Sequence, residues 1–294
     1  MGAADAVPGV SGGTIAFMTG IYEELIHSLK QFGPKAVALL FKEGPVAAWA
    51  YVNGTFLLAL VIGIILSLLT LSHIVLFWLA EYPELLWSFF FGLILASVWS
   101  VSRHIERWDS NSFTAFVAGA VAAYFITTLA PTTIDATPLF IFLSGMVAIC
   151  AMILPGISGS FILLLLGMYT PILGAIKNLE LVTLGIFAAG CAVGLLSFSR
   201  VLSWMFNSFR TTTLALLGGF LLGSLNKVWP WKYTTAYTIN RHNEQVPLVQ
   251  ENISPFTFET MTGQPSLFIY AAALMLLGAA LVLLLEKMGR RSGD

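Results

Sequence analysis

The amino-acid sequence predicts an all-α integral membrane protein, and three observations lead to this class. The chain has 294 residues, of which 57% are hydrophobic and only 10% charged, whereas soluble domains carry about 25% charged residues. Its mean hydropathy is +0.86. Apolar stretches recur along the chain, and each is long enough to cross a bilayer as a helix at about 20 residues per span. The alternating pattern typical of an outer-membrane barrel is not found.

Six membrane-spanning helices are expected, three in each half of the chain. They cover about residues 55–71, 85–101 and 113–130 in the first half, and 181–198, 214–228 and 267–285 in the second. A helical hairpin precedes each set, at residues 1–30 and 138–177, so the two units are residues 1–130 and 131–294. The polar segment Trp229–Pro265 holds Trp229, Trp231, Tyr233 and Tyr237, which we assign to the membrane interface.

Two short helix-breaking motifs lie inside this apolar sequence. They are Pro8–Gly13 (PGVSGG) and Pro155–Ser160 (PGISGS), and they begin 147 residues apart. Proline removes a backbone donor and glycine lowers helix propensity, so neither run suits a helix interior. At membrane depth such backbone is tolerated only where it is buried in protein or lines a cavity. We therefore expect the function at these two motifs.

The motifs belong to an internal repeat. Residues 8–30 align with 155–177 without a gap, and 8 of the 23 positions are identical, mostly Gly, Pro, Ser, Tyr and Lys. Shared hydrophobicity would not produce identities of these types. A weaker match at a spacing of 127 residues aligns 63–101 with 190–228. Each half therefore has the order of a hairpin followed by three spans.

The distribution of Lys and Arg predicts the orientation of the repeats. With Arg290 and Arg291 in the cytoplasm, the loops near Arg103, Arg200 and Arg210 also lie inside, and Trp229–Pro265 lies outside. Lys177 and Lys227 are exceptions, because this count places them on the outer side. The first hairpin then opens to the cytoplasm and the second to the outside. Inverted repeats with broken helices are typical of transporters, whose binding site lies at the repeat interface. Each hairpin is either re-entrant or fully spanning.

The chemistry offered by the motifs is anion binding. The first N–H groups of a helix lack intrahelical partners and form the positive end of the helix dipole, which favours phosphate. The candidate phosphate-binding residues are Gly9, Ser11, Gly12, Gly13, Thr14, Gly156, Ser158, Gly159 and Ser160. In the alternative interpretation, the glycines permit tight helix packing and the hydroxyls satisfy freed backbone groups.

Further candidates lie outside the motifs. The acids Asp5, Glu23 and Glu24 either take part in ion coupling or simply lie at the membrane interface. The arginines Arg103, Arg200 and Arg210 either attract a lipid headgroup or set the topology of the chain. Tyr22 and Tyr169 are matched in the repeat and are candidates for lining the cavity. Cys150 and Cys191 are expected to be buried free thiols. No catalytic residue, cofactor or metal site is expected.

The motifs also carry a family resemblance. Residues Ala4–Thr14 (ADAVPGVSGGT), Gly20–Ile26 (GIYEELI) and Leu154–Ser160 (LPGISGS) resemble the bacterial polyprenyl-phosphate transporter family of the PopT type, over essentially the whole chain. Family members usually carry more sequence before the first motif. The resemblance implies a multi-pass protein of the bacterial cytoplasmic membrane that returns undecaprenyl phosphate from the outer to the inner leaflet for reuse. It also implies inverted repeats with re-entrant helices.

A lipid-phosphate translocase working by alternating access is therefore the leading hypothesis, with polyprenyl phosphate and the bilayer as partners and no nucleic acid. Undecaprenyl-pyrophosphate phosphatases carry a similar Pro-Gly-x-Ser motif but place arginine after the serine. Here that position holds Gly12 and Gly159, so the cation that would stabilise phosphoryl transfer is missing. A small-anion transporter is a third hypothesis. The sequence is also compatible with a homodimer.

Overall fold

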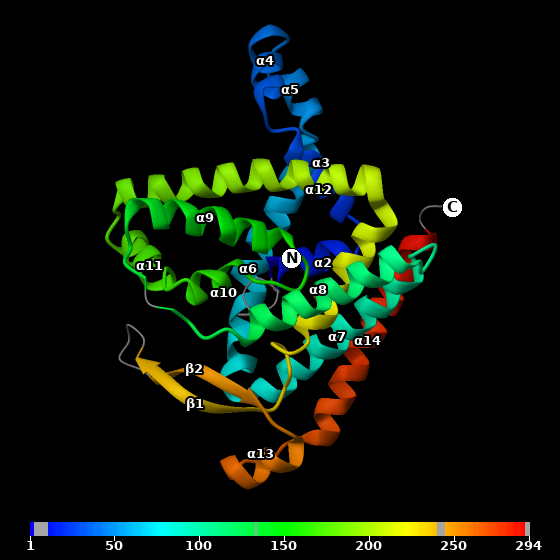
Figure 1. Ribbon diagram of the computed structural model, residues 1–294, viewed down its shortest axis with the longest axis vertical. Coiled ribbons are helices and arrows are strands. Elements are labelled where there is room, and N and C mark those ends of the chain that lie inside the picture. The colour runs from blue at the N-terminus through cyan, green and yellow to red at the C-terminus, as the bar shows by residue number, and fades with distance from the viewer. Residues whose placement is uncertain (3–10, 133, 240–244, 292–294) are drawn as a thin grey trace.

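A computed structural model of the chain is predominantly helical (Figure 1), and it describes residues 1–2, 11–132, 134–239 and 245–291. The candidate residues Asp5 and Gly9 lie outside the described residues. Within the described part, five helices are long and apolar enough to cross a membrane, and the bent pair α10–α11 makes a sixth if it counts as one span. The prediction of an all-α multi-pass membrane protein is confirmed.

The first half begins with short helices and continues with long ones. The helices are α2 (Gly12–Met18), α3 (Tyr22–Lys30), α4 (Pro34–Lys42), α5 (Pro45–Tyr51), α6 (Gly54–Glu81), α7 (Pro83–Arg103) and α8 (Ser110–Thr128). The span expected to end at residue 71 continues as α6 to Glu81, so the predicted connection is helical. Only Tyr82 interrupts the helix, because the following Pro83 disfavours α geometry in the residue before it.

The second half contains the longest helix and a small sheet. Its elements are α9 (Pro138–Ile153), α10 (Gly159–Leu165), α11 (Tyr169–Lys177), α12 (Leu181–Ser224), β1 (Lys232–Ile239), β2 (Gln245–Asn252), α13 (Pro255–Thr262) and α14 (Phe268–Arg291). The span expected at 181–198 lies within α12, and the span expected at 214–228 begins in α12 and continues past its end at Ser224; in place of the predicted loop, a single non-helical residue, Phe209, lies between them. The polar segment after α12 forms the antiparallel β1–β2 hairpin and α13.

The two hairpins share one local structure at the predicted spacing of 147 residues. The bounds of α2 and α3 correspond position by position to those of α10 and α11. Extended residues precede α2 and α10 in both cases, Ser11 with φ −113° and Ser158 with φ −98°. The turn after each helix contains a glycine with positive φ, at Gly20 (77°) and Gly167 (69°). Helices α10 and α11 meet at 110°.

The weaker match at a spacing of 127 residues also has a structural counterpart. Helix α12 bends at Phe209, which has φ −142° and ψ 50°. Tyr82, between α6 and α7, has φ −140° and ψ 59°. The 28 residues of α6 correspond to the part of α12 before the bend, and α7 corresponds to the part after it. A long helix, one non-helical residue and a second helix therefore occur in both halves.

Close helix packing interlocks the two halves. Helix α14 packs on α7, and α8 packs on the part of α12 after its bend. The backbones approach so closely that a Cβ atom on a contact glycine would collide with a carbonyl group of the facing helix. These contacts are Gly92 with Met275, Gly278 with Phe89, Gly219 with Phe116, and Gly119 with Leu216. The last long helix of each half therefore packs against the other half.

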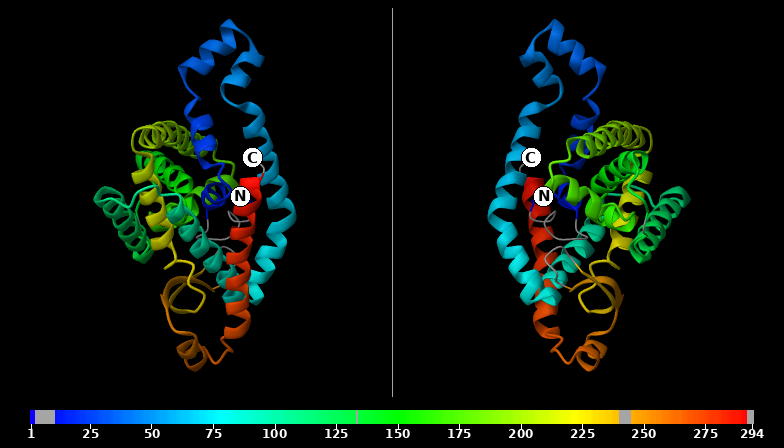
Figure 2. Two further views of the ribbon diagram at one scale, coloured as in Figure 1. Left: turned by 90° about the vertical axis from the view of Figure 1, so that its right-hand side faces the viewer. Right: turned by 90° about the vertical axis from the view of Figure 1, so that its left-hand side faces the viewer.

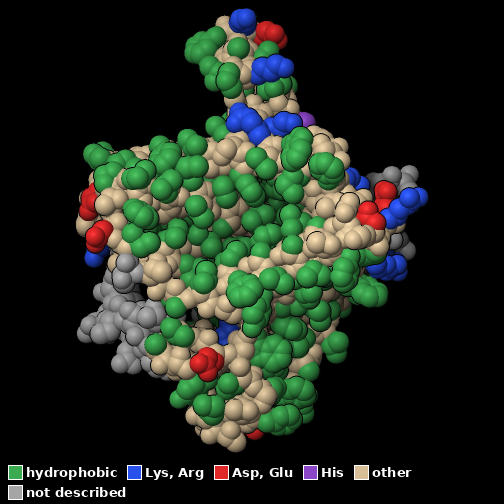
Figure 3. Space-filling model, in the orientation of Figure 1, with side chains coloured by type: hydrophobic (Ala, Val, Ile, Leu, Met, Phe, Trp, Pro, Cys, Tyr) green, Lys and Arg blue, Asp and Glu red, His purple; other side chains and the backbone are tan. Residues whose placement is uncertain are grey.

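Two segments project from opposite ends of the molecule. Helices α4 and α5 extend from one end of the longest axis, and the β1–β2 hairpin with α13 from the other (Figures 1 and 2). Apolar side chains cover much of the surface between these ends (Figure 3). Trp231, expected to anchor the membrane interface, is covered by the protein. It is buried with Leu85, Phe258 and Ala271, and its ring N–H donates to the carbonyl of Ser266 at 2.8 Å.

Candidate functional site

The two helix-breaking motifs meet in the structure. The backbone N–H of Gly156 donates to Thr14 Oγ1 at 2.9 Å. Ser11 Oγ donates to the carbonyl oxygen of Met152, just before the second motif, at 3.0 Å. These bonds join residues more than 140 positions apart. The sequence repeat therefore corresponds to a physical contact near the middle of the fold.

The second break is built by its own residue types. Helix α9 ends before Leu154, which is extended (φ −64°, ψ 130°) because Pro155 follows it. Gly156 has φ +88°, a conformation that favours glycine. A Cβ atom at this position would also lie 2.6 Å from Ser224 Oγ of α12. The glycine therefore allows both the turn and the close approach of α12.

The hydroxyls of the first motif are already bonded to backbone groups. Ser11 is the N-cap of α2 and accepts from the N–H of Gly13 at 3.1 Å. Ser11 and Thr14 are both 0% exposed. A Cβ atom at Gly13 would lie 2.8 Å from the carbonyl oxygen of Ile153. The alternative interpretation, in which hydroxyls satisfy freed backbone groups and glycines permit close packing, thus describes these three residues in this conformation.

The hydroxyls of the second motif have different partners. Ser158 Oγ and Ser160 Oγ hydrogen-bond to each other at 2.8 Å. Ser158 precedes α10 but its side chain does not cap the helix, and it is 8% exposed. Ser160 is exposed. This serine pair is therefore the accessible hydroxyl group of the two motifs, beside amide groups of α10 that have no intrahelical acceptor.

The two repeat-matched tyrosines have different environments. Tyr22 is buried, and its hydroxyl donates to the carbonyl oxygen of Ile153 at 3.0 Å. This hydrogen bond links α3 to the end of α9, and Tyr22 does not line an open cavity in this conformation. Tyr169 begins α11 and is 40% exposed.

Acidic and basic candidates gather where α3 faces α12. Glu23 forms an ion pair with Arg210 at 2.8 Å, and Glu24 accepts from the side-chain amide of Asn53 at 2.9 Å. A pocket of about 280 Å³ is lined by Glu23, Glu24, Ile26, His27, Ser203, Phe206 and Asn207. Arg200 donates to the carbonyl of Phe32 at 3.2 Å. These contacts bring Glu23 together with Arg210, whereas Glu24 and Arg200 have other partners.

Arg103 is not part of that group. It lies in the last turn of α7, is exposed, and forms no ion pair with any described residue. In the described ranges, no group of three or more His, Cys, Asp or Glu side chains is arranged to hold a metal ion. Cys150 and Cys191 are free and half-buried.

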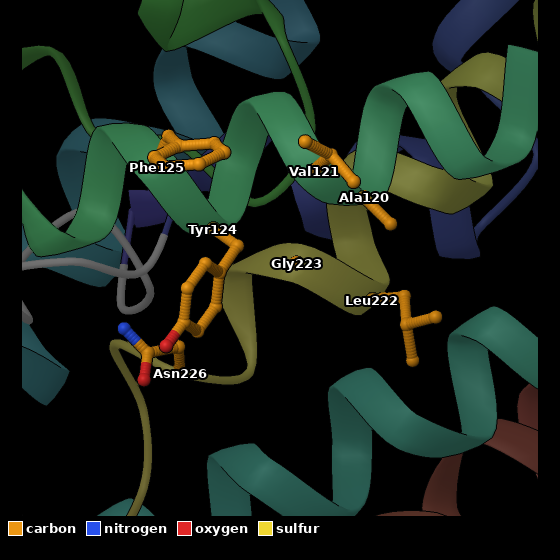
Figure 4. Close-up of a pocket in the computed structure, with 7 residues that line it drawn as sticks. All are labelled: Ala120, Val121, Tyr124, Phe125, Leu222, Gly223 and Asn226. Atoms are coloured by element: carbon orange, nitrogen blue, oxygen red, sulfur yellow. The ribbon is translucent and has the colours of Figure 1, made fainter.

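Sequence reasoning missed a groove and two lysines beside the second motif. The groove, of about 440 Å³, lies between α8 and the end of α12 and is lined by Ala120, Val121, Tyr124, Phe125, Leu222, Gly223 and Asn226 (Figure 4). The lysines are Lys227, directly after the groove, and Lys232 at the start of β1. The sequence did single out Lys227 in one respect. The distribution of charges places it on the outer side, whereas most basic residues lie on the cytoplasmic side.

Comparisons with known proteins identify the family of this chain. The sequence model of a family described as undecaprenyl phosphate translocase-like matches residues 1–246. A polyprenyl-phosphate transporter of Vibrio cholerae is 50% identical over 99% of this chain and 94% of its own length. Another, from Staphylococcus aureus, is 32% identical over 78% of this chain and 83% of its own. No solved structure matches the chain. The chain therefore belongs to the undecaprenyl phosphate translocase-like family and is a multi-pass membrane transporter rather than an enzyme.

Proposed function

We propose that this protein is a translocase that moves undecaprenyl phosphate from the outer to the inner leaflet of the bacterial cytoplasmic membrane, so that the lipid carrier is used again. The two relatives named polyprenyl-phosphate transporters support the substrate class. The observation that carries the mechanism is the meeting of the two motifs, through the bond from Gly156 N–H to Thr14 Oγ1. Two broken helices that meet inside the protein offer one phosphate site to both leaflets.

The physical requirement is a polar path for one charged group. Moving a bare phosphate through hydrocarbon costs tens of kcal/mol by simple solvation estimates. Helix N-termini supply N–H donors and a positive dipole end without a neutralising lysine. The phosphate would bind at residues 9–14 and 156–160 during alternating access, while the isoprenoid chain remains in lipid.

The positions of several basic residues support the predicted sidedness. Helices α4 and α5, with Lys35 and Lys42, lie at the end of the molecule opposite the β1–β2 hairpin. Lys30 bonds to Ser203 Oγ at 3.1 Å, and Arg210 pairs with Glu23 in the same α3–α12 interface. We assign this basic end to the cytoplasm, together with the C-terminus, and the β-hairpin end to the outside. The repeats are then inverted.

The hydroxyl groups of the two motifs differ in exposure, and this difference supports an order in which the motifs bind the phosphate. Ser11 and Thr14 are fully buried and bonded to the second motif, whereas Ser160 is exposed. The phosphate would first reach the Ser158–Ser160 pair from the outer side. Separation of the motifs would then free Ser11 and Thr14 to replace those ligands from the inner side.

Binding of undecaprenyl phosphate to the purified protein in nanodiscs tests this proposal. The variant Ser158→Ala/Ser160→Ala removes two hydroxyls that hold no backbone group, and we expect its affinity to fall about tenfold, since each hydrogen bond to a charged group contributes about 1.5–3 kcal/mol and water partly replaces it. Ser197→Ala is the control, because Ser197 bonds only within its own helix and is exposed. Undecaprenol, which lacks the phosphate, should bind all variants alike. Equal affinity of the double variant and the control for undecaprenyl phosphate would refute the site, and equal binding of inorganic phosphate would favour a small-anion transporter.

A further inference from the structure

Two lysines lie close together at the end of α12. The ammonium group of Lys232 donates to the carbonyl oxygen of Lys227 at 2.6 Å and lies 4.2 Å from the ring centroid of Trp87. The ammonium group of Lys227 lies 4.5 Å from the ring centroid of Phe161. Among the described residues, no carboxylate oxygen lies within 4.0 Å of either lysine nitrogen. Two cations without an acidic partner are therefore held over aromatic rings.

Burial affects the charge of both side chains. Burial lowers the pKa of Lys227, and burial together with the charge of Lys227 lowers the pKa of Lys232 to about 7. Both effects disfavour the charged form of the lysines. An anion bound beside the two ammonium groups would counteract them and favour the charged form. In the space-filling view a Lys or Arg side chain lies in a hollow between the helices and the β-hairpin (Figure 3).

Contacts of α12 place this pair beside the second motif. Ser224 Oγ packs against Gly156, and the N–H of Lys227 bonds to the carbonyl of Ser224 at 2.9 Å in the following turn. Phe161, under the ammonium group of Lys227, directly follows Ser160. Ser224, the last residue of α12, thus contacts the motif, and Lys227, in the turn after α12, contacts the residue that follows the motif.

The β-hairpin is fixed over this site. Asn252, at the end of β2, donates to the carbonyl and side-chain oxygens of Asn226 at 2.8 and 2.9 Å. The indole N–H of Trp229 donates to the carbonyl of Ile253 at 2.8 Å. Lys232, the first residue of β1, is therefore held in place by the fold and is not on a free loop.

The apolar groove ends at the same place. Tyr124 and Asn226 lie together at one end of it (Figure 4), and Asn226 immediately precedes Lys227. Most of the lining is apolar, and its Val121 and Phe125 side chains are exposed. An amphipathic molecule with a long apolar chain and an anionic head would match an apolar groove that leads to two cations.

We propose that Lys227 and Lys232 form the outer loading site for the phosphate of the polyprenyl lipid, with the first isoprene units in the groove between α8 and α12. This inference rests on the proposed function and adds a binding step before the phosphate reaches Ser158 and Ser160. Charge complementarity attracts the head, and the groove holds the adjoining part of the tail, while the remainder of the tail stays in lipid.

The affinity of the purified full-length protein in nanodiscs for undecaprenyl phosphate tests the lysines. Lys227→Gln and Lys232→Gln should each bind about tenfold more weakly or worse, as expected for loss of a charged hydrogen bond. Lys227→Arg and Lys232→Arg keep the charge and should stay within about threefold of wild type. Lys177→Gln is the matched control, because Lys177 is an exposed lysine at the end of α11. Thermal unfolding of each variant confirms that it is folded.

The outcomes separate the two proposals. If the wild-type protein does not bind undecaprenyl phosphate, the proposed function fails. If it binds, and Ser158→Ala/Ser160→Ala weakens binding while the glutamine variants bind like Lys177→Gln, the loading site alone is overturned. Glutamine variants that bind weakly, together with arginine variants that bind normally, establish the role of charge.

The groove is tested by filling it. Val121→Trp should weaken binding of undecaprenyl phosphate several-fold by occupying the space of the first isoprene units. Val147→Trp on α9 is the control, because Val147 has similar exposure (49%, against 47% for Val121) outside the groove. Equal affinities of these two variants would overturn the placement of the tail.

Discussion

At the scale of single residues, the hydroxyl groups of the two motifs differ in their partners. Thr14 and Ser11 bond to backbone groups near the opposite motif, whereas Ser158 and Ser160 bond to each other. The sequence identified all four positions, because serine and threonine beside Gly and Pro are unusual in an apolar chain. It did not reveal the partner of Thr14, since that bond depends on how two segments 142 residues apart cross.

Thr14→Val should destabilise the protein. The substitution preserves the shape of the side chain but leaves the buried N–H of Gly156 without an acceptor, at a cost of about 1–3 kcal/mol. Thr14→Ser retains the acceptor and is the control. We expect a lower midpoint of thermal unfolding in detergent for the valine variant than for the serine variant. Equal midpoints would show that the bond between the motifs contributes little.

Lys232 should make binding of the lipid phosphate depend on pH. Its pKa is about 7 in the free protein, well below the usual value of about 10.4. The phosphate favours the ammonium form of Lys232. The contribution of Lys232 to the affinity is therefore complete below pH about 7 and declines as the pH rises through that value. Above it, the lysine must take up a proton when the phosphate binds. Lys227 is the charged group that lowers this pKa, and Glu251, opposite the neighbouring Tyr233, forms no ion pair with Lys232.

The measurement is the dissociation constant for undecaprenyl phosphate between about pH 7 and 9, where the phosphate is already a dianion because its second pKa is about 6. Affinity of the wild-type protein should fall across this range. Lys232→Arg remains charged throughout and should show a flatter profile. A wild-type profile as flat as that of the arginine variant would contradict the role of Lys232.

At the scale of helices, the charges indicated a break between two spans but overstated its length. Arg200 and Arg210 suggested a polar loop, whereas the break in α12 is the single non-helical residue Phe209, directly before Arg210. The two arginine side chains reach out of the helices to the carbonyl of Phe32 and to Glu23, so their charges do not require a longer loop. Proline, by contrast, gave reliable breaks before Pro83 and Pro155, because its effect on the preceding residue is local.

Helix pairing should depend on the contact glycines. Gly92→Ala and Gly219→Ala would each place a methyl group against a carbonyl of the facing helix, at a cost of about 1–3 kcal/mol. Gly185→Ala is the control, since a Cβ atom there meets nothing within 4 Å. We expect reduced thermal stability for the first two variants and unchanged or slightly higher stability for the third. Three equal midpoints would contradict the observed close packing.

At the scale of the whole molecule, the sequence predicted the class and the repeat but not the pairing of helices. Periodicity and hydropathy identify spans, whereas apolar surfaces in a membrane give little indication of which helices pair. In the structure, α8 packs on α12 and α14 on α7. The halves 1–130 and 131–294 are thus interlocked. In the proposed alternating access, the moving groups of helices would therefore be drawn from both halves.

The predicted sidedness can be measured with single cysteines in a chain whose Cys150 and Cys191 are replaced by alanine. Thr235→Cys in β1 should react with a membrane-impermeant maleimide in intact cells. Lys42→Cys at the end of α4 should react only after the membrane is opened. Both wild-type side chains are exposed, so access to the protein surface does not distinguish them. Labelling of both positions from the same side would contradict the inverted arrangement.

The most direct measurement is the rate at which undecaprenyl phosphate moves between leaflets of liposomes that contain the purified protein. The account predicts faster movement than in protein-free liposomes and no release of inorganic phosphate from undecaprenyl pyrophosphate. It also predicts a strong reduction in Ser158→Ala/Ser160→Ala, with Ser197→Ala unchanged. Movement no faster than in protein-free liposomes, or a double variant as fast as wild type, would contradict a translocase that holds the phosphate where the two broken helices meet.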